Sequence, residues 1–281
     1  MNKIRIITDS GSDIPQNSNT GVTVLPMTIR FGNAEYQDGI DLMPKQFYEK
    51  LIQSDELPTT SLISPAVFEG AFSQATENGE KVIVITISSK LSGTYQSALL
   101  AAEEYPDDVF VVDSKSVAVG EQILVLLALE LIEKGLSAQE TAEQLTKERE
   151  KIHLLAVLDT LEYLKKGGRI SSTVAFFGEA LSIKPVVAVK DGEVAMIGKA
   201  RGSRNGNNYL IKEVESTSGI DFSKPVCLGY SGLDDSLLQK YIEDSSKLWI
   251  GYKESLKISL IGSTIGTHVG PGAIAVAFFE K

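Results

Sequence analysis

The chain contains few of the residues that build disulfides and metal sites. Its 281 residues include one cysteine, Cys227, and two histidines, His153 and His268. A single cysteine excludes an internal disulfide and a metal site of several thiolates, and it fits a protein of a reducing compartment. The two histidines do not form a His-x-x-x-His pair, so a zinc hydrolase is a poor interpretation.

Three glycine-containing signatures of common enzymes are also missing. The sequence has no G-x-x-x-x-G-K-[ST] phosphate loop, and no G-x-G-x-x-G follows its first apolar run. The segment Gly229–Gly232 matches the G-x-S-x-G nucleophile elbow over three residues only. We therefore expect no nucleotide cofactor and no catalytic residue in this chain.

Long apolar runs and excess positive charge are absent as well. The best apolar run, Ile123–Ile132, contains Glu130 and is far shorter than the roughly 18 residues of a membrane span. Asp9 and Asp13 interrupt any signal-peptide-like stretch. The net charge of -10 repels phosphate backbones. These features predict a soluble, cytoplasmic protein that binds no nucleic acid and makes at most transient membrane contact.

The residues that are present predict an α/β fold. Hydrophobic residues make up 43% of the chain, enough for a folded core, and the length corresponds to about two domains. Short β-branched runs alternate with amphipathic stretches, a pattern typical of α/β proteins. We place one α/β domain at 1–152 and a second at 153–281. The predicted strands are Ile4–Thr8, Val82–Ile87, Val109–Val112, Leu154–Leu158, Lys184–Val189, Val194–Lys199, Val226–Tyr230, Leu256–Leu260 and Ala273–Phe279.

Helices are expected between these strands. The predicted helices are Gln46–Gln53, Ala66–Glu77, Thr94–Glu104, Ser116–Lys134, Ser203–Glu215 and Asp234–Leu248. Ser137 and Glu140 form a Ser-x-x-Glu capping box that starts one more helix. Asp191-Gly192 between two strands predicts a tight hairpin.

Five small polar or glycine-rich clusters are candidate binding loops. They are 8–13 (TDSGSD), 59–61 (TTS), 88–94 (SSKLSGT), 165–169 (KKGGR) and 262–272 (GSTIGTHVGPG). Backbone N–H groups at a helix N-terminus favour anions, so hydroxyls such as Ser92 and Thr94 could help to hold a carboxylate or a phosphate there. Each cluster alone is better explained as a helix cap or a turn.

Charged residues near these clusters are further candidates. His268, in a glycine-rich turn, is suited to orient an anion. Arg169 follows two glycines, and an ion pair is its alternative role. Arg201 and Arg204 lie in a polar stretch that suits a partner or phosphate contact. His153 opens an apolar strand and is expected to be structural.

Four aspartates raise the possibility of a metal site. Asp9, Asp13, Asp38 and Asp41 could gather around a magnesium ion. Acidic residues are common in turns, however, and the sequence predicts no metal.

Taken together and in order, five segments resemble the DegV family, bacterial fatty-acid-binding proteins that serve as the lipid-carrying subunit of fatty acid kinase. The resemblance covers essentially the whole chain. The segments are ITDSGSDIP, TTSLISP, LSGTYQSA, LDTLEYLKKGGRI and GTHVGPGAIAVAF.

The resemblance implies two α/β domains with one long-chain fatty acid between them. It implies that Thr60 and Ser92 bind the fatty acid carboxylate, and it places Arg169 and His268 in the surrounding polar network. With their neighbours in the same motifs, the implied fatty-acid-binding residues are Thr60, Ser61, Ser92, Gly93, Thr94, Arg169 and His268.

The resemblance also implies a partner. A separate kinase subunit would carry ATP and convert the bound carboxylate to an acyl phosphate for phospholipid synthesis. Arg201 matches an arginine that relatives need for work with the kinase. The segment Arg201–Gly206 otherwise departs from the family's Arg-Thr-Arg-x-Lys-Ala-like pattern, which affects docking and not the fatty acid pocket.

Two other functions remain open from the sequence. One is an acyl hydrolase or acyltransferase that uses Ser92 and His268. The other is a module that binds a phosphate-bearing ligand through the Ser/Thr clusters.

Overall fold

The computed structural model describes residues 3–16, 21–170 and 183–281, and it confirms the α/β fold. Its first sheet is fully parallel, with the strand order β2-β1-β6-β7. Parallel strands are covered on both faces, so their sequences are continuous apolar runs. Three of the four strands of this sheet were therefore predicted from the sequence. The strands are β1 (Lys3–Asp9), β2 (Val22–Leu25), β6 (Glu80–Thr86) and β7 (Val109–Asp113).

The second sheet is mixed and has the order β10-β9-β8-β13-β11-β12. Only β11 and β12 pair in parallel; the other neighbours are antiparallel. Asp191 and Gly192 both adopt positive φ, 51° and 84°, as a tight two-residue hairpin requires. The strands are β8 (Ile152–Val157), β9 (Ile183–Lys190), β10 (Glu193–Arg201), β11 (Cys227–Tyr230), β12 (Lys257–Leu260) and β13 (Ile274–Phe279).

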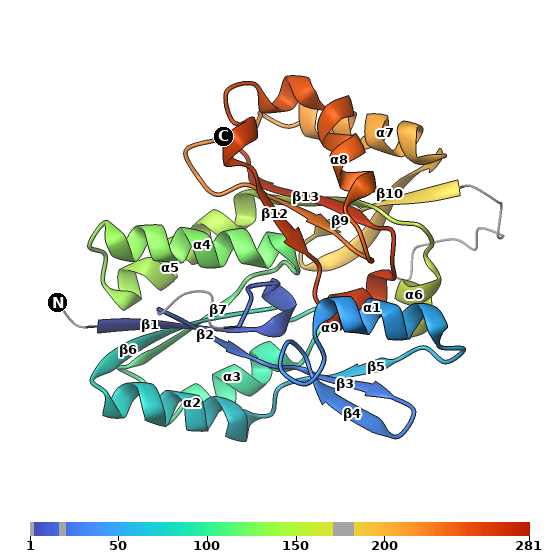
Figure 1. Ribbon diagram of the computed structural model, residues 1–281. Coiled ribbons are helices and arrows are strands. Elements are labelled where there is room, and N and C mark those ends of the chain that lie inside the picture. Colours follow the sequence, from blue (N-terminus) through green and yellow to red (C-terminus); the bar gives the residue numbers. More distant parts are fainter. Residues whose placement is uncertain (1–2, 17–20, 171–182) are drawn as a thin grey trace.

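Helices and sheets alternate in layers (Figure 1). Helices α2 (Pro65–Glu77) and α3 (Thr94–Ala102) cover the outer face of the first sheet. Helices α7 (Ser203–Glu215) and α8 (Ser236–Asp244) cover the outer face of the second. Helices α4 (Val119–Glu133) and α5 (Ala138–Glu148) lie between the sheets.

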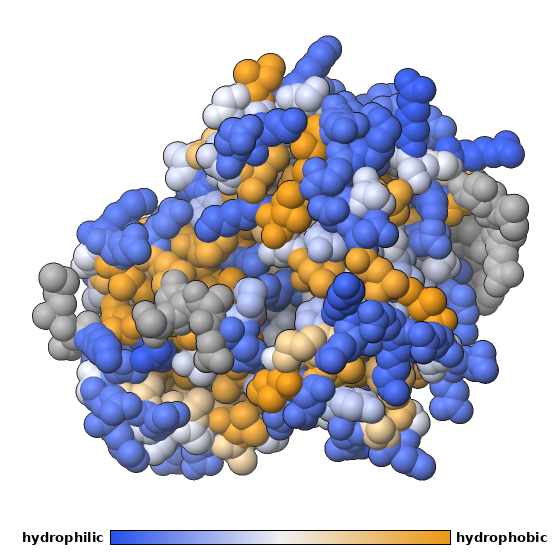
Figure 2. Space-filling view, viewed as in Figure 1, coloured by the Kyte–Doolittle hydropathy of each residue, from blue (hydrophilic) through white to orange (hydrophobic). Residues whose placement is uncertain are grey.

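Helix α4 joins the two sheets into one core. Its side chains are buried on almost every side, so it lacks the polar stripe of a surface helix. It packs against β1 and β6 of the first sheet and against β11 and β13 of the second. On the face seen in Figure 2, apolar side chains gather along α4, whereas much of the remaining surface is hydrophilic.

A smaller unit lies beside this core. Three antiparallel strands in the order β4-β3-β5 adjoin helices α1, α6 and α9. The bounds are β3 (Thr28–Phe31), β4 (Ala34–Gln37), β5 (Thr59–Ser61), α1 (Pro44–Gln53), α6 (Glu162–Gly167) and α9 (Ser263–Val269). Four short 3-10 turns complete the described elements: Ser10–Ser12, Arg149–Lys151, Ser246–Trp249 and Lys253–Ser255.

The structure corrects two predictions of local structure. The glycine-rich turn expected at 262–272 is wrong for Ser263–Val269, which form α9. Gly266 is present because α9 packs tightly on α1: a Cβ at this position would lie 2.7 Å from the Phe47 ring. The helix expected at Asp234–Leu248 ends at Asp244 and gives way to a 3-10 turn.

The boundary near residue 152 stays a prediction. β8 begins at Ile152 and opens the second sheet, whereas every strand of the first sheet precedes it. The apolar core is nevertheless continuous across this point, since Leu154, Ala275 and Phe279 belong to the cluster formed by the first sheet and α4. Among the helices of the described ranges, none has the length and apolar character needed to cross a membrane.

Candidate functional site

A cavity lies where the two halves of the chain meet. Its volume is about 350 Å³, and its walls come from β5, α6, α9, β10 and the loop after β6. Six of the seven residues implied by the family resemblance line it: Thr60, Ser61, Ser92, Gly93, Arg169 and His268. Segments that are far apart in the sequence are therefore brought to one site.

The cavity is polar at one end and apolar at the other. Its polar lining is formed by the six residues above and Thr264. A second space of about 50 Å³ lies beside it and shares part of its wall, including Val117, Val194 and Ile265. Among the described residues, those that line this second space are all apolar, and several are alanines such as Ala118 and Ala156. Such a site suits a ligand with a polar head and an apolar tail.

Thr60 and His268 connect the two halves of the chain at the polar end. The Thr60 Oγ1 atom lies 3.0 Å from His268 Nε2, although 208 positions separate the residues. Gly167 of α6 allows the histidine ring to sit close to the backbone, because a Cβ there would lie 2.3 Å from Nδ1. Gly167 was missed as a site residue by the sequence reasoning, although it belongs to the KKGGR cluster.

His268 is neutral at physiological pH. Burial, with a smaller contribution from the Arg169 charge, lowers the pKa of His268 from 6.5 to about 4. Its Nδ1 atom is enclosed and has no hydrogen-bond partner within the described residues. A neutral imidazole can donate a hydrogen bond through one nitrogen and accept through the other, so this residue can orient a neighbouring polar group.

Ser92 and Thr94 form a small hydroxyl pair at the start of α3. Their hydroxyl oxygens are 2.9 Å apart and share a hydrogen bond. Thr94 is buried and does not line the cavity; it lies behind Ser92 and accepts a hydrogen bond from the Ile63 backbone N–H at 3.5 Å. Thr94 therefore supports Ser92 and links the Ser92 loop to the segment after β5.

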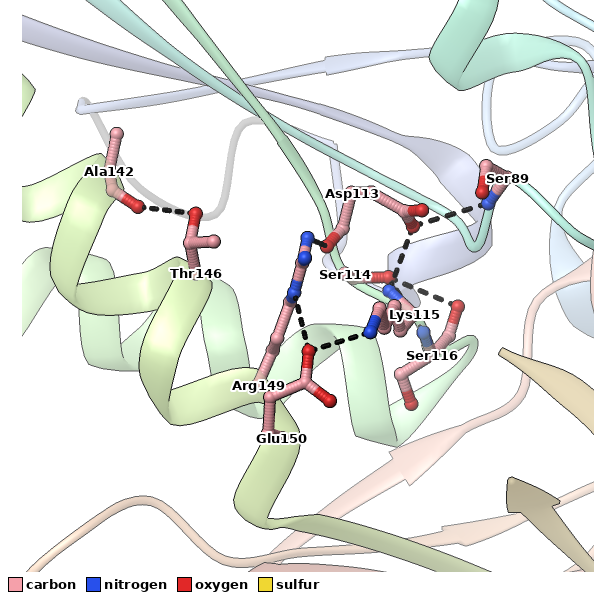
Figure 3. Close-up of polar contacts among 9 residues, drawn as sticks. All are labelled: Ser89, Asp113, Ser114, Lys115, Ser116, Ala142, Thr146, Arg149 and Glu150. Carbon is pink, nitrogen blue, oxygen red and sulfur yellow. Dashed lines mark hydrogen bonds and ion pairs between the residues drawn. The ribbon is translucent and has the colours of Figure 1, made fainter. Parts of the chain in front are cut away.

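The loop that carries Ser92 is fixed from the neighbouring strand (Figure 3). The Asp113 carboxylate accepts hydrogen bonds from the backbone N–H groups of Ser89, at 3.2 Å, and Lys115, at 2.9 Å. Arg149 donates to the Asp113 carbonyl at 2.6 Å and pairs with Glu150. On the other side, the Ser88 hydroxyl donates to the Gly192 carbonyl at the tip of the β9–β10 hairpin.

Arg169 lies at the exposed rim of the cavity. Its guanidinium donates to the carbonyls of Gly167, at 2.5 Å, and Leu91, at 3.5 Å. The alternative ion pair is not found among the described residues. The guanidinium positive charge is therefore not neutralised by a described carboxylate.

Three of the four aspartates considered for magnesium gather near α9, but they bind backbone amides. Asp13 and Asp38 accept hydrogen bonds from the start of α9, and Asp9 accepts from Gly11 and Ile87. Asp41 is exposed and accepts from Gln37. Within the described ranges no group of His, Cys, Asp and Glu side chains is arranged to hold a metal. Burial raises the pKa of Asp9 to about 7 and that of Asp13 well above its usual range.

Arg201 and His153 lie away from the cavity. Arg201 is exposed at the end of β10, just before Gly202, which has a φ of 76°. Arg204 is exposed in the first turn of α7. His153 pairs with Glu280 at 2.9 Å and stacks on Phe278, which fits the structural role expected from the sequence.

Some lining residues carried no signal in the sequence. The apolar wall includes Met27, Leu164 of α6 and Val194 of β10. In the sequence, only the hydropathy of these residues distinguishes them. Thr264 was within a recognised cluster but was not singled out.

Fold and cavity together define an α/β protein with a cavity whose lining is partly polar and partly apolar. A family model described as "Uncharacterised protein, DegV family" matches residues 3–281. The chain belongs to the DegV family.

Known proteins similar to this chain match over its full length. A DegV domain-containing protein of Caldanaerobacter subterraneus subsp. tengcongensis is 35% identical and covers 100% of both chains. A Thermus thermophilus DegV family protein whose structure is described as showing fatty acid binding is 33% identical, with a TM-score of 0.87 over 99% of this chain and 100% of that one. A fatty acid (stearic acid)-binding protein of Eubacterium ventriosum is 26% identical, with a TM-score of 0.84 over 99% and 98% of the chains.

The lowered pKa of His268 makes a testable prediction about stability. The folded protein keeps His268 neutral down to about pH 4, whereas the unfolded chain takes up a proton near pH 6.5. This residue therefore contributes stability above pH 6.5 that is lost as the pH falls toward 4, up to about 3 kcal/mol. Urea titrations of wild type and His268→Gln measure this effect. We expect the difference between their free energies of unfolding, wild type minus variant, to decrease by about 3 kcal/mol as the pH is lowered from 6.5 to 4.

Nuclear magnetic resonance provides a direct check of the same pKa. The ring signal that disappears in His268→Gln identifies His268, and His153→Gln is the control that removes the other histidine. A His268 midpoint near 6.5 would contradict the burial argument.

Proposed function

We propose that this protein binds one long-chain fatty acid and presents its carboxylate to a separate ATP-dependent kinase subunit, which forms an acyl phosphate for phospholipid synthesis. The observation that carries the proposal is a cavity lined by hydroxyls, His268 and Arg169, with a second space beside it that shares part of its apolar wall. The fatty acids bound by the Thermus thermophilus and Eubacterium ventriosum relatives support it.

Burial of the tail supplies the driving force for binding. A sixteen-carbon acid has about 14 methylenes, each worth about 0.8 kcal/mol when removed from water, or about 11 kcal/mol in total. Ordering of the ligand takes back a large share of this free energy. The remainder is sufficient for tight binding in a cavity of about 350 Å³ with a second, apolar space beside it.

The polar end matches a carboxylate. Hydroxyls of Thr60 and Ser92 can donate hydrogen bonds to its oxygens, and such charge-assisted bonds are stronger than neutral ones. The Arg169 guanidinium lies at the same rim and supplies positive charge. Because His268 is held neutral, it orients the carboxylate through a hydrogen bond rather than through a second full charge.

The contacts of Ser92 and His268 favour binding over hydrolysis. A nucleophilic serine requires a histidine base that is itself oriented by a third group. Here Ser92 pairs with Thr94, His268 Nε2 pairs with Thr60, and His268 Nδ1 has no partner among the described residues. These contacts fit a carrier that depends on its kinase partner for chemistry.

Arg201 is the proposed contact to the kinase. It is exposed and lies outside the cavity lining, in a surface stretch that also carries Arg204. A guanidinium there can pair with carboxylates of a partner or with phosphate oxygens during transfer. Its role is therefore separable from fatty acid binding.

Removal of the two hydroxyls tests the carboxylate site. Thr60→Ala and Ser92→Ala should each weaken palmitate binding about tenfold or more, because a hydrogen bond to a charged group contributes about 1.5–3 kcal/mol. Isothermal titration measures the affinity. Thr146→Ala is the control, since that hydroxyl donates only to its own helix at Ala142. Wild-type affinity in the double variant would show that the carboxylate binds elsewhere.

Substitution of Arg201 tests the partner contact. Arg201→Ala should leave palmitate affinity within about twofold and lower the rate of acyl phosphate formation with the kinase and ATP about tenfold, the effect expected for loss of one charged contact. Lys247→Ala, which removes an exposed positive charge elsewhere, is the matched control. Equal losses of binding and turnover in Arg201→Ala would place this residue in the ligand site instead.

A further inference from the structure

Helix α9 forms an important part of the cavity wall, but it is too short to be stable without contacts from other segments. It contributes Thr264, Ile265, His268 and Val269 to the lining. It is only seven residues long, and isolated helices of this length are not stable in water. Its place in the fold must therefore be set by contacts from other segments.

Two carboxylates from the first part of the chain hold its N-terminus. Asp38 accepts hydrogen bonds from the backbone N–H groups of Ser263, at 3.2 Å, and Thr264, at 3.0 Å. Asp13 accepts from the N–H of Gly262 at 2.8 Å. Both side chains are buried, where the low dielectric strengthens hydrogen bonds and a lost partner is costly.

Asp38 is itself tied to the cavity wall. Its backbone N–H donates to the carbonyl of Met27 at 3.0 Å, and Met27 lines the cavity. The same residue thus joins the wall beside β3 to the first turn of α9. The other end of α9 meets Thr60 through His268, at 3.0 Å.

We propose that Asp38 is a positioning residue for the carboxylate end of the cavity: by fixing the first turn of α9, it sets where His268 meets Thr60. This inference rests on the proposed binding of a fatty acid. A slip of α9 along its axis by one residue is about 1.5 Å, enough to break the hydrogen bond between Thr60 and His268. Asp38 therefore affects recognition of the head group without touching the ligand.

The role predicts a loss of selectivity and not a general loss of binding. Palmitate and hexadecanol have tails of the same length but different head groups. If Asp38 sets the polar end, its substitution should weaken palmitate and spare hexadecanol. A purely structural role would weaken both ligands in parallel.

The test compares Asp38→Asn with Asp41→Asn. Asparagine keeps the shape of the side chain, but its amide NH₂ cannot accept the second backbone hydrogen bond. Asp41, close in sequence and exposed, also accepts one backbone N–H bond, from Gln37, and provides the matched control. Affinities for palmitate and hexadecanol are measured by isothermal titration, with thermal unfolding followed in parallel.

We expect palmitate affinity to fall about tenfold in Asp38→Asn, with hexadecanol affinity within about twofold and both unchanged in Asp41→Asn. Parallel losses for the two ligands, or no loss for either, would overturn the role of Asp38. A wild-type protein that binds neither ligand would instead refute the proposed function.

A second variant covers the case in which Asp38→Asn does not fold. Asp13 has a φ of 55°, a left-handed conformation that glycine adopts without strain. Asp13→Gly removes the acceptor of the Gly262 N–H while leaving both Asp38 bonds in place. We expect a smaller but equally selective loss of palmitate affinity, and a non-selective loss would contradict the proposal.

Discussion

The packing of helix α4 between two sheets is the constraint on which the rest of the structure depends. A helix that is apolar on most of its surface must be covered on most sides, and α4 is covered by β1 and β6 on one side and by β11 and β13 on the other. The two halves of the chain therefore share one core instead of meeting at a polar interface. The cavity occurs at the start of this helix, where Val117 and Ala118 form part of its wall. Ala118 has a φ of 53°, and its N–H donates to the Gly11 carbonyl, so the turn into α4 is also tied to the loop after β1.

The site is assembled from short segments that reach this junction from both halves. β5 and the loop after β6 bring hydroxyls, α6 brings Arg169 beside its C-terminal glycines, and α9 brings His268. The loops behind the site have an energetic cost, since burying the carboxyl groups of Asp9 and Asp13, which do not line the cavity, raises their pKa values. Backbone N–H groups offset part of that cost and at the same time fix the geometry of the surrounding loops. Buried acids here serve the architecture of the binding site.

Strands with long apolar runs and helices with clear caps could be predicted from the sequence. The helix at Ser203–Glu215 and the hairpin at Asp191-Gly192 follow directly from local signals. Strands β2 to β5 were not predicted; each has only three or four residues, too few for a periodic pattern, although β11 and β12 are equally short and were predicted. Helix α9 was hidden by its glycines, of which Gly266 serves close packing on Phe47. The motifs indicated six residues that line the cavity, but the place of Thr94 behind Ser92 and the hold of Asp38 on α9 depend on tertiary contacts that no local pattern encodes.

If the junction cavity holds a long-chain fatty acid, the mass of the native protein as purified shows it most directly. Native mass spectrometry followed by solvent extraction and lipid analysis identifies what the cavity carries. The account predicts one free long-chain fatty acid per chain, released intact by extraction and leaving the protein at its sequence mass. A phosphorylated small molecule in its place, or an acyl group that stays covalently attached to Ser92, would contradict it.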